Sequence, residues 1–238
     1  MARLPRLNLP HIPQHVVQRG NNRQATFFDT KDYAVYLDKL KHYAKEYGVK
    51  IHAYVLMTNH VHLLLTQTTA NGTSKLMQSL GRYYVRYFNT TYQRTGTLWE
   101  GRYKSTLVDT ERYFLLVSRY IELNPIRAGI VSDPAKYIWS SYHHNALGKR
   151  ICLLTEHDVY LALGLSSHKR QANYRALFAR EIPAAMLTEI HTATNKMWVL
   201  GSKQFKQQIE TLSGRRSTPI PRGGDRRSES YKKQKDDH

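Results

Sequence analysis

The sequence has little cysteine and few acidic residues. Cys152 is the single cysteine among 238 residues, which rules out a disulfide within the sequence and any zinc site built from several cysteines. There are 18 Asp and Glu residues against 36 Lys and Arg, so the formal net charge is +18. Such an excess attracts polyanions, of which nucleic acid is the commonest large example. A membrane surface is the alternative, but the sequence shows no basic amphipathic helix with a clean apolar face.

Long hydrophobic runs are also missing. Stretches such as "YFLLV" and "HLLLT" have the size of core segments and are far shorter than a transmembrane helix. The N-terminal "MARLPRLNLPHIPQ" is interrupted by prolines, so we do not expect a signal peptide there. A reducing, cytoplasmic location is therefore expected. The hydrophobic fraction of 41% is nevertheless compatible with a folded core.

Apolar periodicity predicts an alternation of strands and helices. Apolar runs predict strands, and apolar residues at three- and four-residue steps predict helices. The expected strands are 14–20, 49–58, 60–67 and 101–109, and the expected helices are 29–47, 73–93 and 110–124. Thr73 or Ser74 is the expected N-cap of the second helix, and Pro125 is expected to end the third.

This order of elements predicts the fold class. A β-α-β-β-α-β order followed by a further helix indicates an α+β, ferredoxin-like fold, similar to RNA-recognition domains. We expect an antiparallel sheet with the helices packed on one face. Residues 146–212 are expected to form a small, mostly helical C-terminal extension. Residues 213–238 are rich in Gly, Pro, Ser and charge, which predicts a disordered basic tail.

Two histidines stand out in the apolar run "LMTNHVHLLLT". His60 and His62 flank Val61, and residues two apart on a strand project from the same face, so the imidazoles point together and Val61 points away. Neutral imidazoles side by side can share a divalent cation. They can equally be sheet histidines bonded to neighbouring groups, so the pair needs a third ligand and a reacting group before it defines a site.

The third helix offers both, in "SRYIELNPIRAG". Tyr120 and Asn124 are four residues apart and share a helix face. The Asn124 carboxamide oxygen is a hard ligand suited to Mg²⁺ or Mn²⁺. A tyrosine hydroxyl can attack a metal-polarised phosphodiester, expel a 3′-hydroxyl and leave a 5′-phosphotyrosine. Tyr113, seven residues earlier, is a competing nucleophile, and in a chain with 17 tyrosines either residue can be a packing aromatic.

Three motifs, "NHVHLLL", "GTLWEGRYKS" and "RYIELNPIRAG", resemble those of the single-tyrosine HUH (IS200-like) transposases, and more closely those of the REP-associated tyrosine transposases. The resemblance implies a catalytic domain over 1–145. It implies an endonuclease and strand transferase that cleaves and rejoins single-stranded DNA hairpins of repetitive extragenic palindromes. It also implies Mg²⁺ or Mn²⁺ as cofactor, with His60, His62 and Asn124 as metal ligands and Tyr120 as the nucleophile.

Basic residues interleaved with aromatic ones fit a single-stranded substrate. Bases stack on aromatic faces for about 1–3 kcal/mol each, while cations contact phosphates. "HVVQRGNNR" resembles the family segment expected to recognise a guide sequence, which places Arg19 and Arg23 there. The other expected DNA contacts are Arg82, Arg86, Arg94, Arg102 and Lys104. The resemblance further implies a bacterial, nucleoid-associated protein that acts as a monomer, although similar transposases can be dimers that exchange the tyrosine helix.

Two other functions stay open at the level of sequence. A non-catalytic, ferredoxin-like nucleic-acid binder would use the same fold, with the histidines and Tyr120 as packing or stacking groups. A tyrosine-nucleophile replication initiator or relaxase would share the chemistry, usually in a longer chain. The histidine pair together with Tyr120 and Asn124 favours the transposase, because a binding module has no need for a nucleophile aligned with metal ligands.

Overall fold

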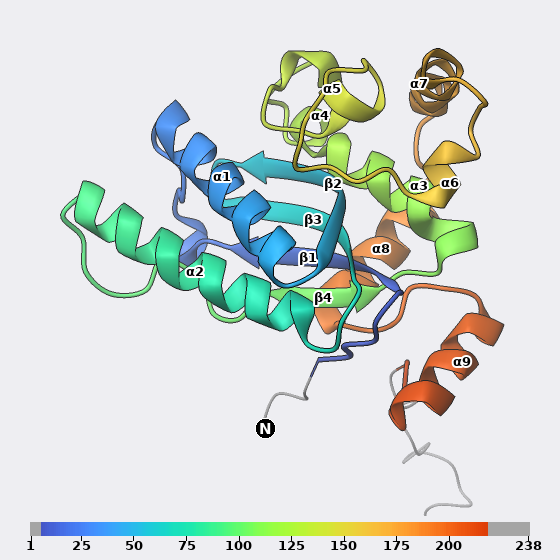
Figure 1. The fold of residues 1–238 in the computed structure, drawn as a ribbon, viewed down its shortest axis with the longest axis horizontal. Helices are drawn as coiled ribbons and strands as arrows, with labels where there is room; N and C mark the ends of the chain where they lie inside the picture. Colours follow the sequence, from blue (N-terminus) through green and yellow to red (C-terminus); the bar gives the residue numbers. More distant parts are fainter. Residues whose placement is uncertain (1–5, 219–238) are drawn as a thin grey trace, which may run out of the picture.

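The computed structural model describes residues 6–218, and its centre is an antiparallel sheet of four strands in the order β2-β3-β1-β4 (Figure 1). The helices α1 (Thr30–Glu46) and α2 (Gly72–Thr91) connect β1 to β2 and β3 to β4. The β-α-β-β-α-β order of a ferredoxin-like α+β fold is thereby confirmed. The strands are β1 (Pro13–Arg19), β2 (Val49–Met57), β3 (His60–Gln67) and β4 (Lys104–Leu107).

The fourth strand is shorter than predicted. Three of the four strands begin and end within one residue of their expected bounds, whereas β4 begins only at Lys104. Gly101 has a φ of 144°, a conformation that side chains disfavour, and it bends the chain before the strand begins. The residues between this bend and β4 line a surface pocket instead of extending the sheet.

The first turns of α1 and α2 are stabilised in different ways. At α1, Asp29 accepts a hydrogen bond from the Lys31 N–H, and the Asp32 carboxylate accepts one from the Asp29 N–H, which forms a capping box. At α2, the prediction of Thr73 or Ser74 as the cap is wrong. The helix begins at Gly72, and the Gln67 side chain at the end of β3 accepts the Thr73 N–H at 2.9 Å. Gln67, in the preceding strand, therefore accepts a backbone N–H of the first turn, as the side chain of an N-cap would.

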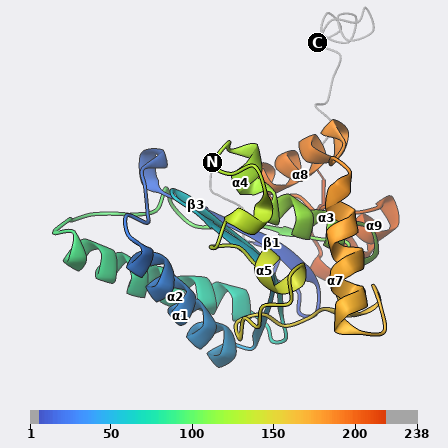
Figure 2. The same ribbon diagram turned by 90° about the horizontal axis from the view of Figure 1, so that it is seen from above.

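Helices cover both faces of the sheet, which corrects the prediction of helices on one face. Figure 2 shows α1 and α2 on one side of the strands, with α3 (Thr110–Glu122) and α8 (Ala184–Lys196) on the other. On the α1–α2 side the core includes Val61, Leu63 and Leu65 from β3. The opposite face of the sheet is also apolar, for example at Leu64, and it packs against α3 and α8. The one-face prediction holds only for the two helices that connect the strands.

The third helix bends where the sequence indicated its end. α3 ends at Glu122, and the short helix α4 (Asn124–Arg127) follows at once with Pro125 in its first turn. Proline lacks an N–H and fits the first turn of a helix, so a new turn begins as α3 ends. A 3₁₀ turn (Pro134–Lys136) and α5 (Tyr142–Asn145) come next.

A buried carboxylate joins α3 to the helices that follow. Glu122 is fully buried and accepts hydrogen bonds from the Ser141 hydroxyl, from Asn145 Nδ2 at 2.9 Å and from the Tyr174 hydroxyl at 2.8 Å. Burial raises the pKa of the Glu122 carboxyl to about 7, and the three hydrogen bonds oppose that shift. The helix that carries Tyr120 is thus tied to the C-terminal part of the chain.

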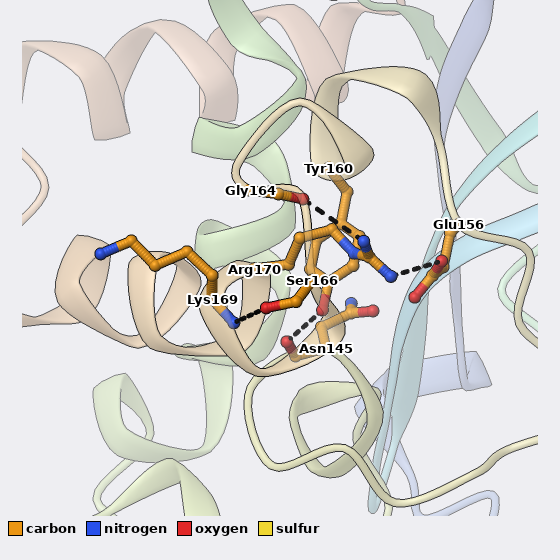
Figure 3. Close-up of polar contacts among 7 residues, drawn as sticks. All are labelled: Asn145, Glu156, Tyr160, Gly164, Ser166, Lys169 and Arg170. Atoms are coloured by element: carbon orange, nitrogen blue, oxygen red, sulfur yellow. Dashed lines mark hydrogen bonds and ion pairs between the residues drawn. The ribbon is translucent and has the colours of Figure 1, made fainter.

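Polar contacts also hold the helices α6 (Asp158–Leu161) and α7 (Ser167–Ala176), as Figure 3 shows. The Tyr160 hydroxyl donates to the Asn145 carbonyl at 2.8 Å. Arg170 donates to the Gly164 carbonyl and lies 3.7 Å from the Glu156 carboxylate. The Ser166 hydroxyl accepts the Lys169 N–H and so caps α7. Each of these contacts fixes the loop or helix end that carries it.

Later parts of the chain bond to both outer strands of the sheet. Beside β4, the Leu200 N–H donates to the Leu107 carbonyl at 2.9 Å, and the Asp109 N–H donates to the Leu200 carbonyl at 2.8 Å. Beside β2, the Leu56 N–H donates to the Trp139 carbonyl and the Thr155 N–H donates to the Ile51 carbonyl. The outward-facing backbone groups of both strands therefore have partners at these positions.

The described chain ends shortly after α9 (Lys203–Ser213). Ser217 is buried, and its N–H and hydroxyl both donate to the Glu210 carboxylate, at 2.7 and 2.8 Å. Most of the tail expected over 213–238, from residue 219 on, lies outside the described residues. Within residues 6–218, none of the helices combines the length and the apolar character that a membrane span requires.

Candidate active site

The two histidines of β3 lie on the face of the sheet that α3 and α8 cover. His62 stands opposite Val17 of β1, and His60 stands opposite Arg19. Val61 is fully buried in the core on the α1–α2 side, so the alternation expected from the sequence is present. His62 is buried and His60 half-buried, and their ring centroids are 5.1 Å apart. The imidazoles therefore lie side by side at one end of β3.

A hydrogen bond sets the tautomer of His60. Its Nδ1 lies 2.6 Å from Asn59 Oδ1, while Asn59 Nδ2 donates to the Arg23 carbonyl at 2.9 Å. A carboxamide oxygen can only accept, so His60 Nδ1 carries the hydrogen and Nε2 keeps a free lone pair. A lone pair at Nε2 is what a metal ligand needs, with the other nitrogen held by a neighbouring acceptor.

A third histidine, which the sequence analysis did not single out, contacts this pair. His15 on β1 is fully buried, and its Nε2 lies 2.9 Å from His62 Nδ1. The two rings stack with centroids 5.1 Å apart. The other ring nitrogen of His15 lies 3.1 Å from the hydroxyl oxygen of Thr194 on α8. The sequence did contain a signal for this contact. His15 stands beside the apolar pair Val16-Val17 in a predicted strand, and a histidine buried there needs a polar partner.

Burial keeps all three imidazoles neutral. It lowers the pKa of His15 to about 3 and that of His60 to about 4, and it moves the pKa of His62 well below its usual range. The positive charges of Arg19 and Arg127 add to the effect at His60 and His62. Neutral imidazole is the form that binds a divalent cation, so the donor set of the pair fits a metal.

The nucleophile expected from the sequence lies beside the histidines. Tyr120 on α3 is buried, with its ring centroid 5.8 Å from that of His15 and 5.9 Å from that of His62. Both contacts are within one chain. The competing residue, Tyr113, is held elsewhere: its hydroxyl donates to the Glu189 carboxylate of α8 at 2.8 Å. Burial, followed by this carboxylate, raises the pKa of Tyr113 to about 12.

Asn124 lies one turn beyond Tyr120, as the sequence indicated. Its Nδ2 donates to the carbonyls of Tyr120 at 2.9 Å and Ile121 at 3.3 Å, so the carboxamide oxygen is left as the group that can bind an ion. Within the described residues, no group of three His, Cys, Asp or Glu side chains is placed to hold a metal. A metal at the histidine pair would therefore need a ligand of another type, and Asn124 carries one.

Comparison with known families decides the identity of this domain. The family described as "Transposase IS200 like" matches residues 9–124, a range that contains His60, His62, Tyr120 and Asn124. Residues 9–124 form an IS200-like transposase domain. The family match supports DNA binding by this domain, as in a transposase.

One solved structure shows a similar fold, and a second is less similar. A REP-associated tyrosine transposase bound to a REP hairpin has a TM-score of 0.52 and 16% identity, over 66% of this chain and 93% of that chain. A candidate transposase from Deinococcus radiodurans R1 has a TM-score of 0.37 and 21% identity, over 51% of this chain and 96% of that chain. None of the curated proteins compared with the chain matches it. The first of these structures confirms the α+β fold of the transposase domain.

Some of the expected DNA contacts of the transposase domain meet next to the histidines. Arg19, Arg102 and Lys104 line a pocket of about 320 Å³ between β1, β4 and the end of α8. Val17 and Arg19, which stand opposite His62 and His60, form one wall of it. Asn195 forms part of another wall, and its Oδ1 accepts a hydrogen bond from Lys104 Nζ at 3.1 Å. The pocket is thus a basic hollow that adjoins the histidine pair.

The remaining expected contacts lie elsewhere on the surface. Arg82 and Arg86 are exposed on α2, which covers the face of the sheet opposite the histidines. Arg23 is exposed in the 3₁₀ turn Asn21–Arg23. Arg94, after α2, donates to the Gln24 side chain at 3.3 Å and so lies near that turn. The structure therefore brings together Arg19, Arg102 and Lys104 but does not bring Arg82 and Arg86 to the histidines.

Proposed function

We propose that the protein is a metal-dependent, REP-associated tyrosine transposase. It binds single-stranded DNA hairpins of repetitive extragenic palindromes, cleaves one strand through a 5′-phosphotyrosine intermediate and rejoins strands. The observation that supports this most directly is the contact of Tyr120 with His15 and His62 within one chain. A module that only binds DNA has no need for a tyrosine beside neutral, aligned histidines.

The metal would be Mg²⁺ or Mn²⁺, held by Nε2 of His60 and His62 and by the carboxamide oxygen of Asn124. The carboxamide oxygen suits hard cations such as Mg²⁺ and Mn²⁺, and the imidazole nitrogens suit borderline divalent metals. When bound, such an ion polarises a phosphodiester and balances the charge that develops on it. The hydrogen bonds to Nδ1 of both imidazoles support the role, because they orient the rings and leave Nε2 facing away.

Tyr120 would act as the nucleophile. Its hydroxyl oxygen attacks phosphorus, the bond from phosphorus to the 3′-oxygen breaks, and the 3′-hydroxyl leaves with a proton. The 5′-phosphotyrosine keeps one phosphodiester-type bond, so the 3′-hydroxyl of another strand can reverse the step and join the ends. In this proposal the protein acts as a monomer, with Tyr120 used beside the histidines of its own chain.

The DNA strand would pass through the basic pocket beside the histidines. Arg19, Arg102 and Lys104 can contact successive phosphates there. Such contacts bind a backbone independently of sequence. The likeness of fold to a transposase bound to a REP hairpin supports a hairpin as the substrate. A protein that acts on such repeats works at the nucleoid, in the bacterial cytoplasm.

A labelled hairpin oligonucleotide with single-stranded flanks tests the proposal. After incubation with Mn²⁺, a denaturing gel should show a covalent protein–DNA adduct for the unaltered chain and for Tyr113→Phe, and none for Tyr120→Phe. The two variants are matched, since each removes one hydroxyl from the same helix. An adduct with Tyr120→Phe would show that the nucleophile is wrong. Hairpin binding without any metal-dependent adduct would favour the non-catalytic nucleic-acid binder.

A further inference from the structure

We propose that His15 and Thr194 are positioning residues that hold His62 in its metal-binding tautomer, so that helix α8 of the C-terminal extension is a part of the active site. The inference rests on the proposed function, because it concerns the metal that His60 and His62 would bind. It adds two residues that act through His62 without touching the ion.

The proposal starts from a continuous line of contacts through the interior. The Thr194 hydroxyl lies 3.1 Å from His15 Nδ1, and His15 Nε2 lies 2.9 Å from His62 Nδ1. All three side chains are buried. Each contact is out of reach of water, so each holds one hydrogen whose position depends on the tautomers of the two rings.

Only one direction of these hydrogen bonds leaves His62 able to bind a metal. If His62 Nδ1 donates to His15 Nε2, then His15 Nδ1 donates to the Thr194 oxygen and His62 Nε2 keeps its lone pair. In the opposite direction, Thr194 donates to His15, His15 donates to His62 Nδ1, and His62 Nε2 carries the hydrogen. The first direction matches the tautomer that Asn59 sets at His60.

The metal-binding tautomer of His62 requires Thr194, because the Thr194 oxygen accepts the hydrogen on His15 Nδ1. Without its oxygen, a hydrogen on His15 Nδ1 would be buried without a partner, which is unfavourable. His15 would then carry its hydrogen on Nε2 and donate it to His62. The loss of one hydroxyl on α8 would thus place a hydrogen on His62 Nε2, where the ion should bind.

The neighbours of Thr194 fix its place over the sheet. The Ala193 carbonyl accepts a hydrogen bond from the Thr106 hydroxyl of β4 at 3.2 Å. On the other side, Asn195 Oδ1 accepts from Lys104 Nζ, also on β4, at 3.1 Å. Two contacts to one strand therefore flank Thr194, and they hold its hydroxyl against His15. This arrangement is more than the packing of an apolar helix requires.

The first test uses the metal-free protein and needs no DNA. Long-range ¹H–¹⁵N correlation spectra of the imidazoles report which ring nitrogen carries the hydrogen. We expect His60 and His62 both to be protonated at Nδ1 and not at Nε2, and we expect His62 to change to the Nε2-protonated form in Thr194→Val. A His62 that carries its hydrogen on Nε2 in the unaltered chain would overturn the proposal.

The second test is the Mn²⁺ affinity of the full chain, measured by calorimetry. Loss of a group behind a metal ligand typically lowers affinity by about 10–100-fold, and we expect this for Thr194→Val and His15→Leu. Thr194→Ser keeps the hydroxyl and His15→Gln offers an amide oxygen to His62, so both should retain most of the affinity. A change of less than about threefold in a folded Thr194→Val protein would contradict the proposal.

A matched control lies on the same helix. The Thr188 hydroxyl is exposed and donates to the Ala184 carbonyl, so Thr188→Val should change neither the spectra nor the affinity. The readouts also separate the two proposals. Mn²⁺ binding that depends on Thr194, without any DNA adduct, would refute only the transposase chemistry. An adduct that forms equally well with Thr194→Val, at unchanged Mn²⁺ affinity, would refute only the role of α8.

Discussion

The guanidinium of Arg127 lies over the ring of Tyr120, with its central carbon 4.2 Å from the ring centroid. Arg127 is the last residue of α4, so the bend at Pro125 brings this cation back over the residue expected to react. A cation held on an aromatic face contributes about 0.5–2 kcal/mol. Here it also places positive charge beside the phenolic group and the phosphate that the group would attack.

Removal of the Arg127 charge should slow strand cleavage. We expect Arg127→Gln to lower the single-turnover rate of adduct formation on a hairpin by about tenfold, which corresponds to about 1.4 kcal/mol of lost transition-state stabilisation. Arg127→Lys keeps the charge without the planar stack, so its rate of adduct formation should lie between those of the unaltered chain and Arg127→Gln. Mn²⁺ affinity should not decrease in either variant. An unchanged rate with Arg127→Gln would mean that the stack serves packing alone.

Substitution of Asp32 should destabilise the fold far more than that of a neighbouring acid. The buried Asp32 carboxylate accepts the N–H groups of Phe28 and Asp29 and the hydroxyls of Tyr87 and Tyr92, which ties α1 to α2. Asp32→Ala leaves these donors without their acceptor and should lower the free energy of unfolding by about 3 kcal/mol or more.

The control for Asp32 is Asp38→Ala on the same helix, where the carboxylate is exposed and lies 3.1 Å from the Lys39 ammonium. We expect a change within about 0.5 kcal/mol there. Urea unfolding followed by circular dichroism measures both values. If both variants lose the same free energy of unfolding, the Asp32 carboxylate is not a major link between α1 and α2.

His52 should make stability depend on pH. Its Nδ1 donates to the Thr155 carbonyl at 2.7 Å, and burial lowers its pKa to about 4 from a usual value of 6.5. Between those two values the unfolded chain binds the proton more readily, so the free energy of unfolding falls as pH drops from 6.5 towards 4 and is unaffected by this group above that range. The contribution is at most about 3 kcal/mol.

Other buried histidines titrate in the same range, so a difference isolates His52. The free energy of unfolding should fall less between pH 7 and pH 4.5 in His52→Gln than in the unaltered chain. Gln keeps a donor for the Thr155 carbonyl but does not titrate in this range. Parallel pH profiles for the two proteins would mean that His52 does not contribute.

The salt dependence of DNA binding should distinguish the two faces of the sheet. Lys104 lines the basic pocket beside the histidines, whereas Arg82 lies on α2 across the sheet. Lys104→Ala should reduce the slope of log affinity against log salt by about 0.7, the value for one phosphate contact on a single strand. Arg82→Ala should leave the slope nearly unchanged. Fluorescence anisotropy with a labelled hairpin measures both, and the reverse ranking would place the strand on the helical face.

Local patterns in the sequence predicted most of the fold. The strand and helix bounds follow from apolar periodicity and turn residues, and the common face of His60 and His62 follows from the two-residue repeat of a strand. The one-turn spacing of Tyr120 and Asn124 was predicted in the same way, since spacing on a helix is a local property. These predictions depend on residues that are neighbours along the chain.

The features that the sequence did not reveal depend on distant residues. The hydroxyl that contacts His15 belongs to Thr194, 179 residues away. The cover of the second face of the sheet comes from α3 and α8, and no periodicity within one element states which face it will pack against. The cap of α2 was misplaced because Gln67, in the preceding strand, supplies the acceptor. Tertiary contacts of this kind override local preference.

The bonds that the chain makes beside β2 and β4 affect how the molecule behaves in a crowded solution. An open outer strand is a template for pairing with another chain, and so for aggregation or domain swapping. Here backbone groups of the same chain take the place of such a partner. Leu200 bonds beside β4, and Trp139 and Thr155 bond beside β2. The segments that follow the transposase domain thus also protect it, and a chain cut before Leu200 should become prone to self-association.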